Sequence, residues 1–241
     1  MLTSKDAKDQ TTTYTYDGGS DRVASVTQSD GTAVSYTYAA DSYGTYRVAS
    51  MTTGTGAAAQ TLTLGYDLTN SITTVTDTLG RTWTYTYGKA GRLLQATMPA
   101  VNGSTPITTY QYDANGNLLQ MTDANGGITS YGYDANGNLL SVEDATGHTV
   151  SYTYNDDDQV LSQTIYTVPA QGVVGQHGYV APSGAQTTYY VYDTSDRLSY
   201  VVDPLGHVTE HDYTTTGGLT VLSSTRQYLA ATYSLAGLSP S

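Results

Sequence analysis

Residues 207–211 read His-Val-Thr-Glu-His and match the H-x-x-E-H motif of one class of zinc protease. That chemistry requires a helix, because only there do the two histidines lie close enough on one face to share an ion while Glu210 acts as the base. The surrounding residues instead predict a strand, in which His207 and His211 share a face but lie about 13 Å apart. We therefore interpret the motif as structural, and we expect neither a metal nor another cofactor.

The acidic run Asp156–Asp158 carries oxygen ligands of the kind that calcium prefers. A calcium-binding loop needs acidic residues at alternate positions, then a glycine and a distal glutamate, and this spacing is absent. A solvated turn is the favoured interpretation, and the same holds for the Asp-Ala-Asn-Gly-Asn segments. No Ser–His–Asp arrangement can be assembled with the four histidines, of which His148 and His207 occupy the same position of a repeat. We expect no catalytic residues and no enzyme activity.

An internal repeat of about 21 residues dominates the sequence. The octapeptide Tyr-Asp-Ala-Asn-Gly-Asn-Leu-Leu occupies residues 112–119 and returns at residues 133–140. Degenerate copies extend the repeat in both directions, each anchored by a tyrosine: Tyr16, Tyr38, Tyr66, Tyr87, Tyr112, Tyr133, Tyr154, Tyr192 and Tyr213. The residues that best define it, which we expect to have structural roles, are Tyr16, Asp17, Tyr66, Asp67, Tyr112, Asp113, Gly116, Leu118, Tyr133, Asp134, Gly137, Leu139, Tyr192, Asp193 and Leu198.

Each copy of the repeat reads as two strands and two turns. Tyr, Thr and Val at alternate positions suit a pleated surface, and Asp-Ala-Asn-Gly supplies the residues that tight turns need. Nine copies predict about 18 strands in an all-β array, because turn signals return every 8–12 residues. We assign residues 14–213 to this array, with insertions near 52–60 and 167–186. Residues 1–13 are expected to be a linker or flexible N-terminus. Residues 214–241 are expected to be a degenerate last repeat and a tail, in which residues 227–236 have the one helix-compatible pattern.

The Tyr-Asp-x-x-Gly-x-Leu cores, with the Asp-x-x-Gly that follows each, resemble the YD-repeat, or Rhs-repeat, family. The clearest copies are residues 112–126, 133–147 and 192–206. The resemblance implies β-hairpins joined side by side into one long curved antiparallel sheet, a spiral wall or an open barrel segment. In the family such sheets wind into hollow shells that enclose toxic polypeptides in bacterial toxins, or that stand on cell surfaces, as in teneurins and wall-associated proteins. Nine units are too few for a closed shell, so a non-catalytic wall segment for encapsulation or for cell-surface display and adhesion is expected.

The composition limits the partners of the chain. Among its 241 residues, 21 are acidic and 9 basic, giving a formal net charge of −12, which argues against nucleic acid and anionic membrane surfaces. No run of apolar residues is long enough to insert into a membrane, and the absence of cysteine excludes disulfides. The resemblance implies a secreted or cell-surface bacterial protein. Since no signal peptide precedes the array, we expect either another export route or a chain cut from a longer precursor.

Two other functions stay open. Exposed strand edges at the ends of an array favour self-assembly into an extracellular filament or tube. The 24 tyrosines, beside one tryptophan and no phenylalanine, also suit a carbohydrate-binding surface. The tyrosines in or near the irregular units are the candidates to face a ligand: Tyr43, Tyr46, Tyr166 and Tyr179. The expected partners are therefore further YD repeats of the same or a neighbouring chain, an enclosed toxin polypeptide, or a surface glycan.

Overall fold

The computed structural model describes residues 1–172 and 177–229. These residues form nineteen strands and one short 3-10 helix: β1 (Leu2–Lys5), β2 (Thr11–Tyr16), β3 (Val23–Gln28), β4 (Ala33–Ala40), β5 (Tyr46–Thr53), η1 (Gly56–Ala58), β6 (Gln60–Asp67), β7 (Ile72–Thr76), β8 (Thr82–Tyr87), β9 (Leu93–Thr97), β10 (Ile107–Tyr112), β11 (Leu118–Thr122), β12 (Ile128–Tyr133), β13 (Leu139–Glu143), β14 (Thr149–Tyr154), β15 (Val160–Val168), β16 (Ser183–Tyr192), β17 (Leu198–Val202), β18 (Val208–Thr216) and β19 (Leu219–Tyr228). The described residues contain no helix with the length and apolar character needed to cross a membrane.

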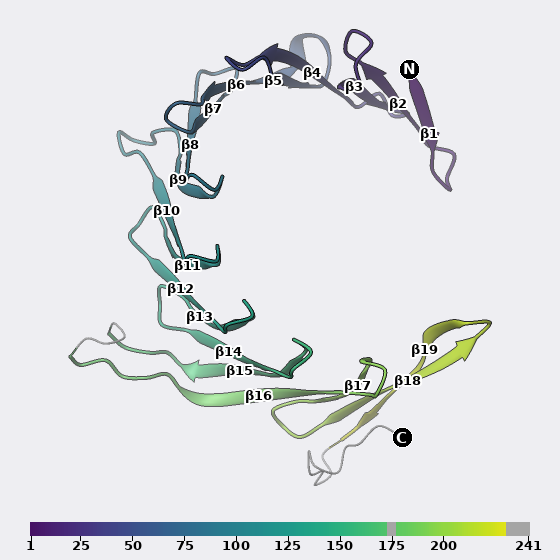
Figure 1. Cartoon of the computed structure of the whole chain (residues 1–241), viewed down its shortest axis with the longest axis vertical. Coiled ribbons are helices and arrows are strands. Elements are labelled where there is room, and N and C mark those ends of the chain that lie inside the picture. Colours follow the sequence, from purple (N-terminus) through teal and green to yellow (C-terminus); the bar gives the residue numbers. More distant parts are fainter. Residues whose placement is uncertain (173–176, 230–241) are drawn as a thin grey trace. The chain divides into compact units, whose positions relative to one another are not determined.

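All nineteen strands belong to one antiparallel sheet. Each strand pairs with the next one in the chain, from β1 to β10 and from β11 to β19. The predicted all-β array of hairpins is confirmed. The sheet divides into two compact units, residues 1–110 with 123–125, and residues 111–122 with the described residues from 126 onward. Within each unit the strands follow one another in chain order (Figure 1).

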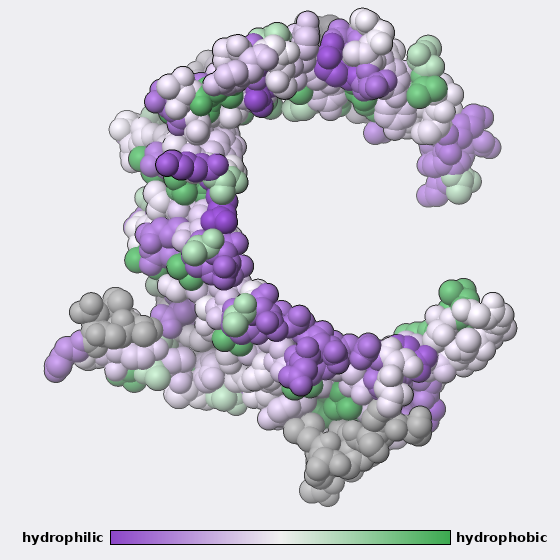
Figure 2. All heavy atoms as spheres, in the orientation of Figure 1, coloured by the Kyte–Doolittle hydropathy of each residue, from purple (hydrophilic) through white to green (hydrophobic). Residues whose placement is uncertain are grey.

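The sheet has almost no dry core. The buried apolar side chains of the described residues are Ala96, Ala170 and Val208. Figure 2 shows polar residues interspersed with scattered apolar ones over the visible face. Cross-strand hydroxyl pairs add to the backbone ladder, as between Thr153 and Ser162, whose side-chain oxygens lie 2.7 Å apart. Each such pair contributes about 0.2–1 kcal/mol, so the thin sheet depends on many small, repeated contacts.

The first thirteen residues form a hairpin, contrary to the expected linker. Strand β1 pairs with β2, and Leu2 lies opposite Tyr14. The turn between them has the hydrogen bonds of the repeat, because the Asp6 N–H donates to the Gln10 carbonyl at 3.1 Å. Asp9 takes the left-handed backbone conformation, with φ of 60°, at the place where other copies have glycine. The sequence pattern stopped short of this hairpin because it lacks the anchor tyrosine as well as the glycine, since Lys5 precedes Asp6.

The insertions and the C-terminal region are also more regular than expected. The segment 52–60 is a short connection, in which η1 separates the ends of β5 and β6. The two ends of the segment 167–186 lengthen a hairpin, because β15 continues to Val168 and β16 begins at Ser183, while residues 173–176 lie outside the described residues. Beyond Tyr213 the array continues through the β18–β19 hairpin. The helix-compatible segment 227–236 begins inside β19, and its residues from 230 onward lie outside the described residues.

Most anchor tyrosines lie at a β-bulge, where the pairing with the following strand shifts by one residue. This shift occurs at Tyr16, Tyr38, Tyr87, Tyr133, Tyr154, Tyr192 and Tyr213. A bulge bends the strand and redirects the side chain at that position. Anchor side chains reach back to the previous strand with or without a bulge, since Tyr66 has none. Their hydroxyl groups donate hydrogen bonds of 2.8–3.0 Å to backbone carbonyls: Tyr38 to Val23, Tyr66 to Val48, Tyr154 to Leu139, Tyr192 to Val160 and Tyr213 to Leu198.

We expect Tyr38→Phe to lower the free energy of unfolding by about 1 kcal/mol, because it leaves the Val23 carbonyl without this donor. Tyr36→Phe is the matched control on the same strand, since its hydroxyl does not belong to this set of bonds, and its effect is expected within about 0.5 kcal/mol. Urea unfolding of the two variants, followed by circular dichroism, compares them. Equal losses in both variants would contradict a specific role for the anchor hydroxyl.

Candidate functional site

The aspartate after the anchor tyrosine organises a five-residue loop, which we call the YD loop. In the loop that Asp134 begins, its N–H donates to the Asn138 carbonyl at 3.0 Å, and its own carbonyl accepts from Gly137 at 3.2 Å. Its Oδ1 accepts the N–H groups of Asn136 and Asn138 at 2.9 and 2.8 Å, and its Oδ2 accepts from Asn138 Nδ2 at 3.0 Å. Gly137 has a φ of 92°, which explains the glycine in this position.

The second turn has the same geometry in three repeats, in which Asp77, Asp144 and Asp203 replace the YD aspartate. Partial burial opposes ionisation of Asp134, but the backbone and side-chain donors of Asn138 outweigh it and hold its pKa below the usual value. The pKa is likewise lowered at nine further aspartates of the described residues: Asp30, Asp41, Asp67, Asp77, Asp113, Asp144, Asp193, Asp203 and Asp212. Nine of these ten carboxylates are structural acceptors for backbone N–H groups, whereas Asp212, within β18, accepts from the side chains of Ser224 and Arg226.

The acidic run Asp156–Asp158 forms the tip of one such loop, with Asn155 in the place of the aspartate. Asn155 Oδ1 accepts the N–H groups of Asp157 and Gln159 at 3.1 and 2.8 Å. Asp158 occupies the glycine position with a φ of 61°, and its Oδ1 accepts from Asn138 Nδ2 of the preceding copy at 2.6 Å. Loop geometry therefore accounts for these side chains, as the turn interpretation predicts.

The two histidines of the His-Val-Thr-Glu-His string have separate environments. His211 lies within β18, opposite Thr225, as predicted for a strand. His207 was also assigned to the strand, but it is the last residue of a loop, and its Nδ1 lies 2.7 Å from Asp203 Oδ2. His148 has the equivalent position beside Asp144. Within residues 1–172 and 177–229, no three His, Asp or Glu side chains are placed to hold one metal ion.

Arginines that follow a YD loop join one copy of the repeat to the next. Arg197 donates from Nε to Asp193 Oδ2 at 2.7 Å, and its guanidinium lies 4.8 Å from the centre of the Tyr213 ring. Arg47 has the same relation to Asp41 and Tyr66, with a ring distance of 5.5 Å. A cation over an aromatic face contributes about 0.5–1 kcal/mol at a partly exposed site. These arginines were not predicted from the sequence, in which they stand at different distances from the aspartate, four residues after Asp193 and six after Asp41.

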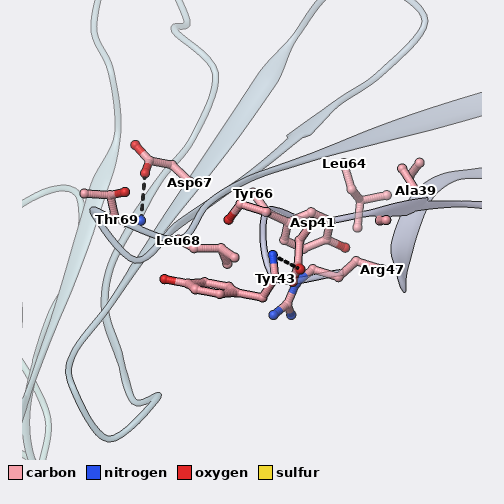
Figure 3. Close-up of a pocket in the computed structure, with 12 residues that line it drawn as sticks. Ala39, Asp41, Tyr43, Arg47, Leu64, Tyr66, Asp67, Leu68 and Thr69 are labelled. Carbon is pink, nitrogen blue, oxygen red and sulfur yellow. Dashed lines mark hydrogen bonds and ion pairs between the residues drawn. The ribbon is translucent and has the colours of Figure 1, made fainter. Parts of the chain in front are cut away.

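A cleft of about 450 Å³ lies in the first unit between the Asp41 loop and the Asp67 loop. Asp41, Ser42, Tyr43 and Arg47 line it from one loop and its strands, whereas Tyr66, Asp67, Leu68 and Thr69 line it from the other. Ala39, Ala49 and Leu64 are among its other lining residues. Figure 3 shows Tyr43 and Leu68 side by side, with the Arg47 guanidinium beside the base of Tyr43.

This cleft exists because the hairpin between β4 and β5 is longer than in a regular copy. Ala39 and Ala40 separate the anchor Tyr38 from Asp41, and they pair with Arg47 and Tyr46. The Asp41 loop keeps its regular hydrogen bonds, including those from the N–H groups of Tyr43 and Thr45 to Oδ1, both at 2.9 Å. The two extra residue pairs extend the strands before the loop begins, and they leave space between it and the Asp67 loop.

The four tyrosines that were expected to face a ligand lie in different places. Tyr43 lines the cleft, and 81% of its accessible surface is exposed. Tyr46 is outside it, with the Arg22 guanidinium 4.2 Å from its ring centre. Tyr166 lies on β15 opposite Ala185, and Tyr179 follows a turn in the loop between β15 and β16. The structure thus does not bring these four side chains together, and ligand binding by them stays a prediction.

Two family models match the chain. The one described as Teneurin YD-shell matches residues 96–201, and the one described as RHS Repeat matches residues 66–100. Together they cover more than half of the 241 residues. No curated protein sequence matches the chain.

Solved structures share the fold at low sequence identity. The crystal structure of TcdB2-TccC3-TEV matches with a TM-score of 0.50 and 14% identity, covering 88% of this chain and 13% of that chain. The crystal structure of TcdB2-TccC3 without its hypervariable C-terminal region has a TM-score of 0.48 and 16% identity, with coverages of 92% and 15%. The Photorhabdus luminescens Tc holotoxin pore has a TM-score of 0.47 and 13% identity, with coverages of 88% and 13%.

This chain spans only 13–15% of the length of these three chains. The first of those similarities supports a common fold of repeated hairpins. The family models match the copies whose Tyr-Asp cores and Asp-x-x-Gly turns define the repeat, and the observed loops and bulges give those residues their structural roles. The chain belongs to the YD-repeat, or RHS-repeat, family.

Proposed function

We propose that the chain is a non-catalytic wall segment which, with further YD repeats of the same or a neighbouring chain, builds a shell around a polypeptide cargo. One observation carries this proposal: the polar groups of the repeat-defining residues hold the sheet itself. The Asp193 carboxylate accepts N–H groups of its own loop, and the Tyr213 hydroxyl bonds to the Leu198 carbonyl of the previous strand. Polar groups that make these bonds stabilise the sheet, and few of them are left to act on a substrate.

The family relationship supports the same function. The chain shares its fold with a segment of a protein crystallised as TcdB2-TccC3-TEV. By analogy the cargo is a toxin polypeptide, and the complete protein is a secreted or cell-surface bacterial product. Display on the cell surface and adhesion are the alternative use of the same wall.

The first and last strands offer edges for the neighbouring repeats. Every residue of β1 is exposed, and so are nine of the ten residues of β19. Leu219 and Leu222, on β19, expose 67% and 53% of their surface. Strands of this kind invite pairing with a further strand. In a wall, those further strands are the adjoining repeats.

Hydrogen–deuterium exchange of the isolated chain and of the natural gene product that contains it tests the proposal. We expect the amides of β1 and β19 to exchange rapidly in the isolated chain and slowly in the natural product, because pairing protects them there. The amides of β13, inside the array, serve as the control and exchange slowly in both. Rapid exchange of both end strands in the natural product would contradict a continuous wall.

The same measurements separate the alternatives. Protection of β19 that grows with the concentration of the isolated chain would indicate self-assembly into a filament. Protease treatment of the natural product distinguishes enclosure from display, since an enclosed polypeptide survives until the shell unfolds. A displayed one is cleaved at once.

A further inference from the structure

The cleft between the Asp41 and Asp67 loops has features that the repeat does not require. Tyr43 stands at the third position of its loop, where the Asp77 loop has Leu79. Both side chains are exposed, at 81% and 76%, and a single exposed apolar side chain is ordinary on a protein surface. Tyr43 differs because its ring also borders a cleft that is lined by a second loop.

The size and lining of the cleft suit one small ring-shaped group. Its volume of about 450 Å³ falls in the range of small-molecule sites. Tyr43 and Leu68, from different loops, offer apolar surface, while the Arg47 guanidinium and the Thr69 hydroxyl offer hydrogen-bonding groups (Figure 3). Apolar surface with a few convergent polar groups is the usual composition of a binding site.

Hydrogen bonds and an ion pair within the two loops and their strands hold these side chains in place. Asp41 Oδ2 accepts from Arg47 Nε at 2.7 Å, and only 6% of the Asp41 side chain is exposed. The Tyr66 hydroxyl donates to the Val48 carbonyl at 2.9 Å, which fixes the opposite wall. A site whose groups are held before binding loses little entropy on binding. The Asp41 contact engages Nε, and Figure 3 shows the two Nη groups of Arg47 directed away from Asp41.

Charge decides which class of ligand fits. The lining holds two carboxylates and one guanidinium, and the whole chain has a net charge of −12, so an anionic ligand is repelled. Both carboxylates of the lining already accept hydrogen bonds from the protein, so neither is available to bind a cation. Asp41 accepts two backbone N–H groups and Arg47, and Asp67 accepts from Thr69 and from both the backbone and the side chain of Asn70. A neutral ligand with hydroxyl groups remains.

We propose that this cleft binds one pyranose ring of a neutral glycan. The C–H face of the sugar lies on the Tyr43 ring, whose negative face attracts the weakly positive hydrogens. Tyrosine supplies that surface with only two side-chain torsions to immobilise. Sugar hydroxyls accept from the Nη groups of Arg47 and exchange hydrogen bonds with Thr69. This site is independent of the wall function, so either proposal can fail without the other.

Titration of the ¹⁵N-labelled full chain with methyl β-glucopyranoside, methyl α-mannopyranoside and N-acetylglucosamine tests the site by NMR. We expect at least one of these sugars to shift amides at residues 41–47 and 66–69 and not elsewhere. Tyr43→Ala is expected to raise the Kd about tenfold or more, and Tyr43→Phe, which keeps the ring, to change it less than about twofold. Leu79→Ala is the control at the same loop position and leaves the Kd unchanged.

Several results would overturn the proposal. One is that none of the three sugars, and no neutral glycan on a glycan array, binds the folded chain. Others are shifts centred outside the two loops, equal losses in Tyr43→Ala and Leu79→Ala, or array binding confined to acidic glycans. Binding of an aromatic peptide at the cleft in place of every sugar would also overturn it. The variants at Tyr43 and Leu79 alter exposed side chains, and circular dichroism verifies that they fold.

Discussion

Gly147→Ala is expected to lower the free energy of unfolding by about 3–4 kcal/mol. Gly147 has a φ of 84°, a conformation that costs an alanine about 1–2 kcal/mol. A Cβ at this residue also meets the Ala170 carbonyl oxygen at 2.3 Å. The Ala170 N–H donates to the Gly147 carbonyl at 2.8 Å, so moving one backbone segment breaks this bond as well.

Gly206→Ala is the matched control. Gly206 occupies the same place in an Asp-x-x-Gly-His loop and has a φ of 83°, but a Cβ there meets nothing within 4 Å. We expect it to cost only the conformational part, about 1–2 kcal/mol. Urea unfolding compares the two variants, and limited proteolysis reports whether the connection between β15 and β16 has detached from the Gly147 loop. Equal losses would show that the Ala170 contact adds no stability.

The contact between Gly147 and Ala170 also shows where sequence reasoning ends. The period of the tyrosines and the Asp-Ala-Asn-Gly turns predicted the strands, because alternation and turn chemistry are local properties. Nothing local indicates that the segment after β15 returns to the loop that precedes β14. The Tyr213 hydroxyl is a similar case, since the sequence shows a ring and a hydroxyl but not the bulge that aims them at Leu198.

Only part of the candidate site could be predicted from the sequence, because the site forms between two loops that strand pairing brings together. Tyr43 stood out because the copy around it is irregular, and the structure places it in a cleft. Its companions Tyr66 and Leu68 belong to the next copy, where they look like regular repeat residues. Two loops that are 26 residues apart in sequence become neighbours only through the pairing of β5 with β6. The N-terminal hairpin was missed for another reason. Asp9 adopts the backbone conformation that glycine has in most other copies, but it is not a glycine, so the turn is not recognisable from the residue type.

Acid is expected to unfold the chain steeply below about pH 4, because its loops depend on ionised aspartates. For ten aspartates of the described residues the folded-state pKa lies below the usual value. A lowered pKa in the folded state means that the stabilisation is complete above the unfolded-state pKa and is lost as the pH falls toward the folded-state value. Thermal midpoints measured from pH 7 to pH 3 should therefore change little above about pH 5 and fall sharply below about pH 4.

Repulsion among the 21 acidic residues acts in the opposite direction, because protonation relieves it. Salt separates the two effects. Added sodium chloride screens the repulsion between exposed charges but leaves the short hydrogen bonds from N–H groups to carboxylates largely intact. If the loops control acid stability, the fall below about pH 4 persists in high salt. A midpoint that stays constant down to pH 3 would contradict this role of the loops.

One loop of the chain has an uncharged asparagine in place of the first aspartate, and this permits a sharper test. Asn155 replaces the aspartate there, and its Nδ2 donates to Gln159 Oε1 at 2.8 Å. In the Asp113 loop, burial opposes ionisation, but the backbone and side-chain donors of Asn117 and the N–H of Gly116 hold the pKa below its usual value. At pH values above global unfolding, we expect the NMR shift of the Asn117 amide, which donates to the Asp113 carboxylate, to titrate more than that of the Gln159 amide, which donates to the uncharged Asn155 side chain. The double variant D113N/N117Q copies the Asn155–Gln159 pair, so its residue-117 amide should lose the titration and its thermal midpoint should fall less in acid. Retention of the titration in that variant would mean that another group controls it.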